Sequence, residues 1–176
     1  MLLRELLAGT PVFQIWGSRE IVIEGLAIEA DDIRPNDLYI YMQNREGISY
    51  EASIKKAIDQ GAAAICIDKG YDVLPYDITF IKTYNVKRFL SAISKNFYQN
   101  PSQNIDMIGI TGSHGKTTIG NMIRSILKAA GIQTVMINTS SCRLGDDPSY
   151  ISDDILNPVV FTKFLNEAVK AQAYMG

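Results

Sequence analysis

The chain has 176 residues, of which 47% are hydrophobic and 20% are charged, a balance typical of one large globular domain or of one small domain followed by part of another. Its formal net charge is −2 and it has no block of lysine and arginine, which argues against a protein that binds nucleic acid by neutralising phosphates. No apolar run is long enough for a membrane span, and charged residues interrupt the short apolar start, so we expect a cytoplasmic protein without membrane contact.

Strand and helix signals alternate through the first half of the chain, after a short amphipathic helix at its start. One helix should begin after its cap Ser49 and end at Gly61. A second should begin after Asn85, because apolar residues then recur at the spacing of one helical face. We expect a half-buried strand or hairpin over residues 20–30 and buried strands over residues 37–42, 62–68 and 78–83.

The polar segment over residues 99–104, which carries a proline, is the expected domain boundary. It divides the chain into a first domain over residues 1–102 and a second over residues 103–176. The alternation of strand and helix signals begins again after this segment, which supports the division.

The second half has the strand–helix–strand pattern of a βαβ unit, which implies a parallel sheet with a right-handed crossover. Buried strands are expected over residues 105–110 and 134–138, and the helix between them should end at Gly131. A polar loop over residues 140–154 and a last helix over about residues 158–174 follow. The inner face of the first of these helices is expected to consist of Ile119, Met122, Ile123, Ile126, Leu127 and Ala130.

The sequence GSHGKTT joins the expected strand to this helix. In such a loop the backbone N–H groups and the positive end of the helix dipole converge on one point, where an anion binds. Glycines remove side chains that would keep phosphate oxygens away from the backbone. Lys116 is the expected catalytic residue, because it brings a positive charge to the outer phosphates, and the hydroxyl of Thr117 is the expected magnesium ligand. The expected nucleotide-binding residues are Gly112, Ser113, His114, Gly115, Lys116, Thr117 and Thr118.

The loop departs from the usual G-x-x-x-x-G-K-[ST] pattern because Ile110 occupies the position of the first glycine. The alternative is a glycine-rich turn that binds nothing, but the strand–loop–helix context favours a nucleotide site. His114 is the only histidine, and we expect its backbone N–H to matter more than its ring. Thr139 and Ser140 follow the second strand at the carboxyl edge of the sheet, where they are candidates for substrate or magnesium contacts.

The sequence GITGSHGKTT over residues 109–118 closely resembles the nucleotide-binding loop of the Mur ligase family, the ATP-dependent amide ligases of peptidoglycan synthesis. Upstream, EADDIRPNDLYIY over residues 29–41 resembles a run in the N-terminal domain of the family's UDP-N-acetylmuramoyl-tripeptide synthetases. The segments EGISYEASIKKAIDQGAAAICID and FYQNPS resemble the stretches that follow it, so the similarity covers nearly the whole chain.

The resemblance implies an α/β fold class, with a small N-terminal α/β domain that binds a UDP-sugar, followed by the incomplete beginning of a P-loop parallel-sheet domain. It implies ATP and Mg²⁺ as cofactors, and a UDP-sugar-peptide and an amino acid as further partners. It also implies that C-terminal domains or a partner subunit must complete the catalytic site, so that activity is expected of the full-length protein and is left open for this chain. The implied UDP-sugar contacts are Ala30, Asp31, Glu46 and Gly47.

The family's serine and arginine beside the UDP-sugar correspond to Ala30 and Asp31, and we expect the carboxylate of Asp31 to repel a diphosphate. Two interpretations therefore remain open. The chain is either the N-terminal part of a ligase that activates a carboxylate as an acyl phosphate, or a truncated or degenerate nucleotide-binding module without ligase activity. A third, a P-loop kinase or transporter subunit, is disfavoured by Ile110 and by the Mur-like first half.

Overall fold

The structure is a computed structural model, and it describes residues 1–43, 49–138, 142–144, 147–150 and 157–171. The chain divides into two compact units, Met1–Phe97 and Tyr98–Gly176. The expected boundary after residue 102 lies slightly further along the chain. The assignment of a UDP-sugar-binding domain and an ATP-binding domain to these units stays a prediction.

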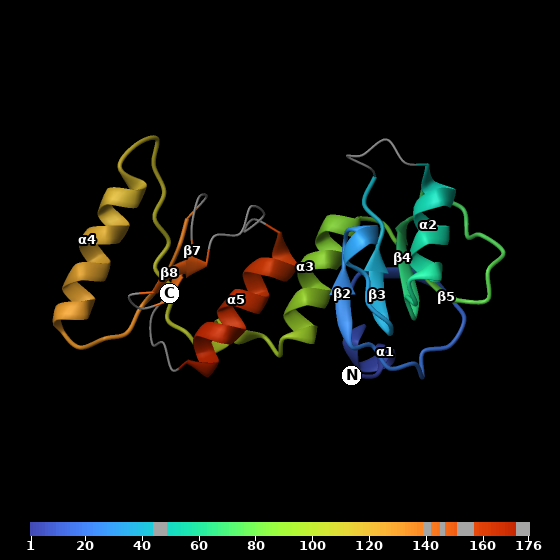
Figure 1. Ribbon diagram of the computed structural model, residues 1–176, viewed down its shortest axis with the longest axis horizontal. Helices are drawn as coiled ribbons and strands as arrows, with labels where there is room; N and C mark the ends of the chain where they lie inside the picture. Colours follow the sequence, from blue (N-terminus) through green and yellow to red (C-terminus); the bar gives the residue numbers. More distant parts are fainter. Residues whose placement is uncertain (44–48, 139–141, 145–146, 151–156, 172–176) are drawn as a thin grey trace. The chain divides into compact units, whose positions relative to one another are not determined.

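The first unit is built on five strands, β1 (Val12–Trp16), β2 (Gly25–Ala27), β3 (Asp37–Ile40), β4 (Ala64–Asp68) and β5 (Thr79–Thr83). Their order in the sheet is β1-β5-β4-β3-β2 (Figure 1). The last four strands in sequence are parallel to their neighbours, and β1 pairs with β5 in the antiparallel direction. The α/β class is confirmed, as are three of the predicted strands, whereas the segment expected over residues 20–30 contains only the short β2 and β1 was not predicted.

Helices cover both faces of this sheet. The helix α2 (Tyr50–Asp59) lies on one side and α3 (Val86–Phe97) on the other, where it contacts the short α1 (Leu3–Leu6) (Figure 1). Ile65 and Ile67, alternate residues of β4, pack into one core cluster with α2. Because both faces are covered, β3 is buried along its whole length, the pattern that parallel strands between two helical layers require.

The predicted helix caps of this unit are confirmed. The Ser49 hydroxyl accepts a hydrogen bond of 3.2 Å from the N–H of Ala52 at the start of α2. The Asn85 side-chain oxygen accepts one of 2.9 Å from the N–H of Arg88 at the start of α3. These caps satisfy backbone donors that the helix leaves unpaired, and so they fix where each helix begins. Each helix buries one face: Ile54 and Ala57 of α2 and Phe89, Leu90 and Ile93 of α3 are buried.

The second unit contains the 3-10 helix η2 (Pro101–Gln103), the helices α4 (Lys116–Ala129) and α5 (Pro158–Lys170), and the strands β6 (Val135–Ile137), β7 (Cys142–Leu144) and β8 (Asp147–Tyr150). The strands form an antiparallel sheet in the order β6-β7-β8. The prediction of a polar loop over residues 140–154 is therefore wrong, because that segment contains two strands. A small core joins this sheet to α5 and consists of Ile105, Val135, Cys142, Phe164, Leu165 and Ala168.

The predicted βαβ unit is not formed here. Residues 105–110 form no strand, and residues 107–112 have no regular secondary structure. β6 pairs with β7 instead, with Val135 opposite Leu144. An antiparallel partner close in sequence needs only a short connection, whereas a parallel strand needs a crossover and cover on both faces. The antiparallel pairing of β6 with β7 needs only the short connection between them, and it is the pairing found in the structure.

The helix α4 follows the expected range but does not bury the expected face. Ile119, Met122 and Ile126 are 48%, 60% and 68% exposed, and Ala130 is exposed as well. Ile123 and Leu127 are half-buried, and Gly120 is the buried residue of the helix. The prediction is wrong at these positions because no parallel sheet among the described residues lies against this face.

The helix α5 begins as predicted, with Pro158 in its first turn and Asn157 as its cap. The Asn157 side-chain oxygen accepts a hydrogen bond of 3.0 Å from the N–H of Val159. Its predicted end near Tyr174 lies outside the described residues. Among the residues that the structure describes, no helix combines the length and the apolar character needed to cross a lipid bilayer.

Candidate functional site

The loop before α4 has the backbone conformation that its glycines permit. Gly115 is the N-cap residue, with φ of 79° and ψ of −2°, a left-handed conformation that strains any residue with a Cβ. A Cβ placed on Gly115 would meet no heavy atom within 4 Å, so the space beside the loop is open. Gly112 also has a positive φ, of 155°. The two glycines thus stand where the backbone turns into the helix and where a ligand has access.

Lys116 is the first residue of α4, and its ammonium folds back over the loop. The Nζ atom donates a hydrogen bond of 2.5 Å to the carbonyl oxygen of Gly112. No side chain among the described residues caps the start of α4, and no acidic residue lies in its first turn. The unpaired N–H groups, the positive end of the helix dipole and the lysine charge therefore act in the same place, which makes this helix start suited to an anion.

The structure brings the predicted nucleotide-binding residues together in one exposed stretch, residues 112–118. His114 and Thr117 are both exposed there. Among the described residues, no group of three or more His, Cys, Asp or Glu side chains is arranged to hold a metal ion.

Ile110, the departure from the usual loop pattern, has a packing role. A Cβ on Gly120 would lie 3.5 Å from the Cδ1 of Ile110 and 3.0 Å from the Cε of Met136. The Ile110 side chain thus packs against α4 at Gly120, where the glycine lets the helix approach it closely. An isoleucine before this loop is compatible with the open space beside Gly115.

A second group of predicted residues lies in the first unit, in the 3-10 helix η1 (Ala30–Asp32). The Asp31 carboxylate forms an ion pair with the ammonium of Lys56 from α2. Lys56 was not predicted, because the pairing depends on contact between η1 and α2, which sequence spacing does not report. The Asp31 charge that should repel a diphosphate is thus offset by an adjacent cation. The predicted residues Glu46, Gly47, Thr139 and Ser140 lie outside the described residues.

A cluster of three tyrosines follows the carboxyl ends of β3 and β4. The ring of Tyr41 lies 5.1 Å from those of Tyr50 and Tyr71, edge to face in both pairs. The Tyr50 hydroxyl donates a hydrogen bond of 2.7 Å to the carbonyl oxygen of Asp72. Burial, the Tyr71 hydroxyl and the charge of Glu51 raise the pKa of Tyr41 to about 12. Burial and the Glu51 charge also raise the pKa of Tyr50.

The tyrosine cluster was not predicted as a unit. Its three members come from different elements, and their scattered sequence positions gave no signal that they meet. At neutral pH the Tyr41 and Tyr50 hydroxyls keep their protons, because their raised pKa values lie far above it. The cluster therefore offers aromatic edges and neutral hydroxyl groups, without charge, beside the sheet edge that carries the Asp31 segment.

The family model for the Mur ligase middle domain matches residues 110–175. The UDP-N-acetylmuramoyl-L-alanyl-D-glutamate–2,6-diaminopimelate ligase of Clostridium tetani is 35% identical over 152 residues, which cover 85% of this chain and 31% of that protein. The protein of the same name from Alkaliphilus oremlandii is 32% identical over 172 residues, which cover 97% of this chain and 34% of that protein.

Solved structures show the same similarity of fold. A UDP-N-acetylmuramoyl-L-alanyl-D-glutamate–2,6-diaminopimelate ligase matches 99% of this chain with a TM-score of 0.75 at 14% identity. A UDP-N-acetylmuramoylalanyl-D-glutamyl-2,6-diaminopimelate–D-alanyl-D-alanyl ligase from Acinetobacter baumannii matches 94% of it with a TM-score of 0.56. The chain spans about a third of the length of these relatives.

Proposed function

Because the chain belongs to the Mur ligase family, we propose that it is the N-terminal part of an ATP-dependent amide ligase of peptidoglycan precursor synthesis. The observation that carries the proposal is the exposed loop before α4, where Lys116 and the uncapped helix start create a site for phosphates. The relatives from Clostridium tetani and Alkaliphilus oremlandii are named as ligases, and the proposal extends that activity to the protein that contains this chain.

In the proposed reaction, an oxygen of a substrate carboxylate attacks the γ-phosphorus of ATP, and the bond to ADP breaks. An amine then attacks the carbonyl carbon of the acyl phosphate, so that an amide forms and inorganic phosphate leaves. The Lys116 ammonium and the N–H groups of Gly115 and the first turn of α4 would bind the outer phosphate oxygens and stabilise the charge that moves onto them. Mg²⁺, held by the Thr117 hydroxyl, would supply further positive charge to the same oxygens.

The first unit is proposed to bind the carboxylate substrate, a UDP-sugar-peptide, at its η1 edge. The candidate contacts are Ala30 and Asp31, together with Glu46 and Gly47. Lys56 supports this assignment, since its ammonium offsets the negative charge of Asp31 that would otherwise repel a diphosphate. Thr139 and Ser140 are proposed to contact substrate or magnesium in the second unit. The reaction is proposed to take place in the cytoplasm, where ATP is available.

The chain is also proposed to need further polypeptide for catalysis, as C-terminal domains or as a partner subunit. Two observations support this. The chain spans about a third of its relatives' length, and the apolar face of α4 at Ile119, Met122 and Ile126 is exposed. Binding that exposed face to added structure would remove apolar surface from water.

The second candidate is a nucleotide-binding module that no longer forms an amide. Asp31 favours it, because a carboxylate stands where the family's arginine meets the UDP-sugar. The two candidates differ in whether the acceptor binds, and that can be measured separately from nucleotide binding.

Titration calorimetry of the full chain, with UDP-N-acetylmuramoyl-L-alanyl-D-glutamate and with magnesium–ATPγS in separate experiments, tests the proposal. We expect both to bind, and we expect ADP formation from ATP and acceptor by this chain alone to be weak or absent. Binding of the nucleotide without the acceptor would select the module. Failure of both to bind, or robust magnesium-dependent turnover by this chain, would contradict the proposal or its requirement for further polypeptide.

A further inference from the structure

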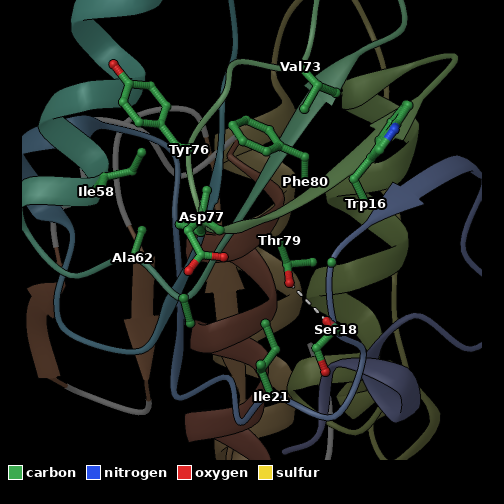
Figure 2. Close-up of a pocket in the computed structure, with 13 residues that line it drawn as sticks. Trp16, Ser18, Ile21, Ile58, Ala62, Val73, Tyr76, Asp77, Thr79 and Phe80 are labelled. Atoms are coloured by element: carbon green, nitrogen blue, oxygen red, sulfur yellow. Dashed lines mark hydrogen bonds between the residues drawn. The ribbon is translucent and has the colours of Figure 1, made fainter.

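A cavity of about 610 Å³ opens in the first unit, at the amino-terminal ends of β4 and β5 (Figure 2). Ala63 directly precedes β4, Thr79 begins β5, and Gly17 and Ser18 follow the end of the neighbouring β1. Pockets that hold small organic molecules have volumes of roughly 300–1,000 Å³. The cavity is therefore large enough for such a ligand.

The cavity has an apolar interior and a polar mouth. Phe80 is 1% exposed and forms part of the floor, and Ile21 and Ile58 are half-buried walls. Tyr76 and Asp77 are exposed at the rim. A ligand that enters would place its apolar part against the floor and any charged group at the rim.

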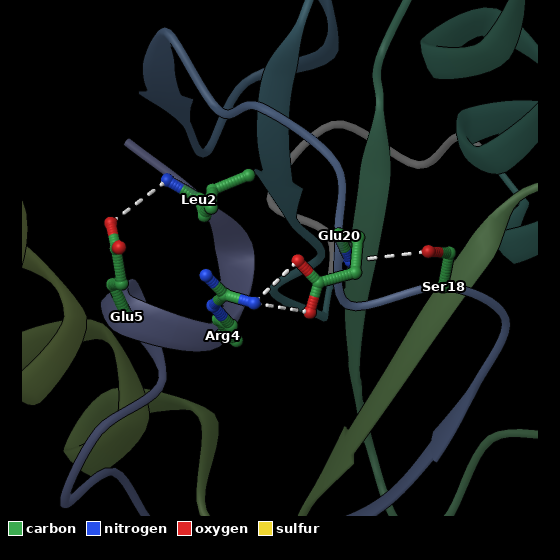
Figure 3. Close-up of polar contacts among 5 residues, drawn as sticks. All are labelled: Leu2, Arg4, Glu5, Ser18 and Glu20. Carbon is green, nitrogen blue, oxygen red and sulfur yellow. Dashed lines mark hydrogen bonds and ion pairs between the residues drawn. The ribbon is translucent and has the colours of Figure 1, made fainter.

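The wall formed by the segment after β1 is fixed by hydrogen bonds. The Thr79 hydroxyl donates one of 3.0 Å to the carbonyl oxygen of Ser18, drawn in Figure 2. The Ser18 hydroxyl accepts a hydrogen bond of 3.1 Å from the N–H of Glu20. The Arg4 guanidinium donates hydrogen bonds of 2.9 and 2.7 Å to the two carboxylate oxygens of Glu20 (Figure 3). The wall thus exists before any ligand arrives, which lowers the entropic cost of binding.

Gly17 keeps this wall close to β5. A Cβ on Gly17 would lie 2.6 Å from the Thr79 hydroxyl oxygen, and its φ of 102° disfavours any other residue.

The electrostatics of the cavity favour a cation. Asp77 is the one carboxylate among the lining residues, which include no lysine, arginine or histidine, and within the described part of the chain it has no hydrogen bond or ion pair. The Thr79 hydroxyl donates its hydrogen bond to the carbonyl oxygen of Ser18, so its lone pairs are left to accept one from a ligand. Ile58, in the last turn of α2, and Ala62, just beyond the end of that helix, also line the cavity, and the carboxyl end of a helix carries partial negative charge.

An aromatic surface beside the rim already accommodates a cation. Trp16 is part of the cavity wall, and Lys82 is not. The Lys82 ammonium lies 5.5 Å from the centroid of the Trp16 ring. Such contacts arise because the face of an aromatic ring is electron-rich. The Lys82 charge would repel a second cation at this ring, so the positive charge of a ligand belongs at Asp77 and not at Trp16.

The cavity is separate from the proposed acceptor site. Because β2, β3, β4 and β5 are parallel, the segments that follow these strands lie at one edge of the sheet and the segments that precede them lie at the other. Asp31 follows β2, whereas Ala63 precedes β4. A ligand in the cavity would therefore occupy the edge opposite to η1.

We propose that this cavity binds a small organic cation, an ammonium group carried on an apolar or aromatic body. The ammonium donates hydrogen bonds to the Asp77 carboxylate and to the Thr79 hydroxyl oxygen, and the body packs against Phe80 and its apolar neighbours. The site is independent of the nucleotide loop and of the proposed ligase function.

The test uses the ¹⁵N-labelled full chain titrated with 2-phenylethylamine, with its neutral analogue 2-phenylethanol, and with the phenylacetate anion. We expect the amine to shift the amide signals of Ala63 and Thr79 in a saturable way. We expect it to bind about tenfold more tightly than the alcohol, because a hydrogen bond to a charged group adds that much. Equal affinities for the three probes, or shifts confined to residues 112–118, would overturn the proposal.

Two variants and a control localise the binding. Asp77→Asn should weaken amine binding about tenfold and leave alcohol binding unchanged. Ala62→Leu should reduce binding of both by filling the cavity. Asp72→Asn, which removes an exposed carboxylate of the same loop that does not line the cavity, should leave the amine affinity unchanged. If Asp77→Asn and Asp72→Asn bind the amine equally well, the cavity is not a cation site.

Discussion

Asp31 shows how one residue changes meaning between the sequence and the folded chain. In the sequence, the carboxylate of Asp31 next to Ala30 predicts repulsion of a diphosphate. In the structure, that carboxylate forms an ion pair with the Lys56 ammonium. Its side chain is 69% exposed and that of Lys56 is 37% exposed, so solvent screens much of their attraction. The Asp31–Lys56 ion pair therefore contributes little to the free energy of unfolding. Its larger effect is on the local charge at the site where a ligand would bind.

Removing the Asp31 charge tests this directly. We expect Asp31→Asn to change the free energy of unfolding by less than about 0.5 kcal/mol, because exposed ion pairs contribute little. The same change should strengthen binding of UDP-N-acetylmuramoyl-L-alanyl-D-glutamate, because it frees the Lys56 ammonium, and Lys56→Met should weaken it. Urea denaturation and titration calorimetry measure the two effects, with Asp32→Asn in the same 3-10 helix as the control. Weaker acceptor binding by Asp31→Asn would refute the role given to Lys56.

Tyr41 makes the stability of the first unit depend on alkaline pH. Burial raises its pKa to about 12 from an ordinary 10.0, so the folded chain keeps a proton that the unfolded chain loses. The stabilisation is complete below the unfolded pKa and is lost as pH rises from about 10 towards 12. We expect the urea midpoint to fall less steeply between about pH 10 and 12 in Tyr41→Phe than in the unchanged chain. The same slope in both would exclude this tyrosine as a source of the alkaline destabilisation.

At the scale of elements, the helices of the first unit follow from local rules. Ser49 and Asn85 are caps in the structure as in the sequence, because a side-chain oxygen and the N–H groups of the first turn lie within three residues of each other. The strand β1 was missed because its pairing with β5 joins residues far apart in the chain. All five of its residues are exposed or half-buried, so β1 lacks the alternation of buried and exposed residues that marks a strand.

The cap at Ser49 provides the prediction at this scale. We expect Ser49→Ala to lower the free energy of unfolding by about 1 kcal/mol, because the N–H of Ala52 loses its partner. Ser49→Asp keeps an acceptor there and should retain most of the stability. Trp16, the only tryptophan, lies in the same unit, so its fluorescence during urea denaturation reports the change. Identical midpoints for the alanine and aspartate variants would show that the cap is not a source of stability.

At the scale of the whole molecule, the two units differ in how well they could be predicted. The α/β class of the first unit and three of its strands were predicted because strand and helix signals alternate there, and each buried strand has neighbours within the same unit. In the second unit the loop and α4 were placed correctly, because glycine, lysine and helix signals are local. The pairing of β6 with β7 was not predicted, because the partner of a strand depends on which other strands are present to share its hydrogen bonds.

The exposed face of α4 yields a prediction about association. Ile126 is 68% exposed, so Ile126→Glu should change the free energy of unfolding by less than about 0.5 kcal/mol while reducing self-association of the chain. Leu165 on α5 is 2% exposed, and Leu165→Ala should cost roughly 2–5 kcal/mol. Sedimentation and urea denaturation followed by circular dichroism measure both properties. A large loss of stability in Ile126→Glu would mean that this face is packed in the isolated chain.

The central claim is that the loop before α4 holds the phosphates of a nucleotide, and amide NMR tests it most directly. Magnesium–ATPγS is titrated into the ¹⁵N-labelled chain, into Lys116→Ala, and into Lys128→Ala as a control that removes a charge from the other end of the same helix. We predict saturable shifts at Ser113, Gly115 and Lys116 in the unchanged chain and in the control, and their loss in Lys116→Ala with all other signals retained. Unchanged affinity in Lys116→Ala, or shifts that avoid this loop, would contradict the claim.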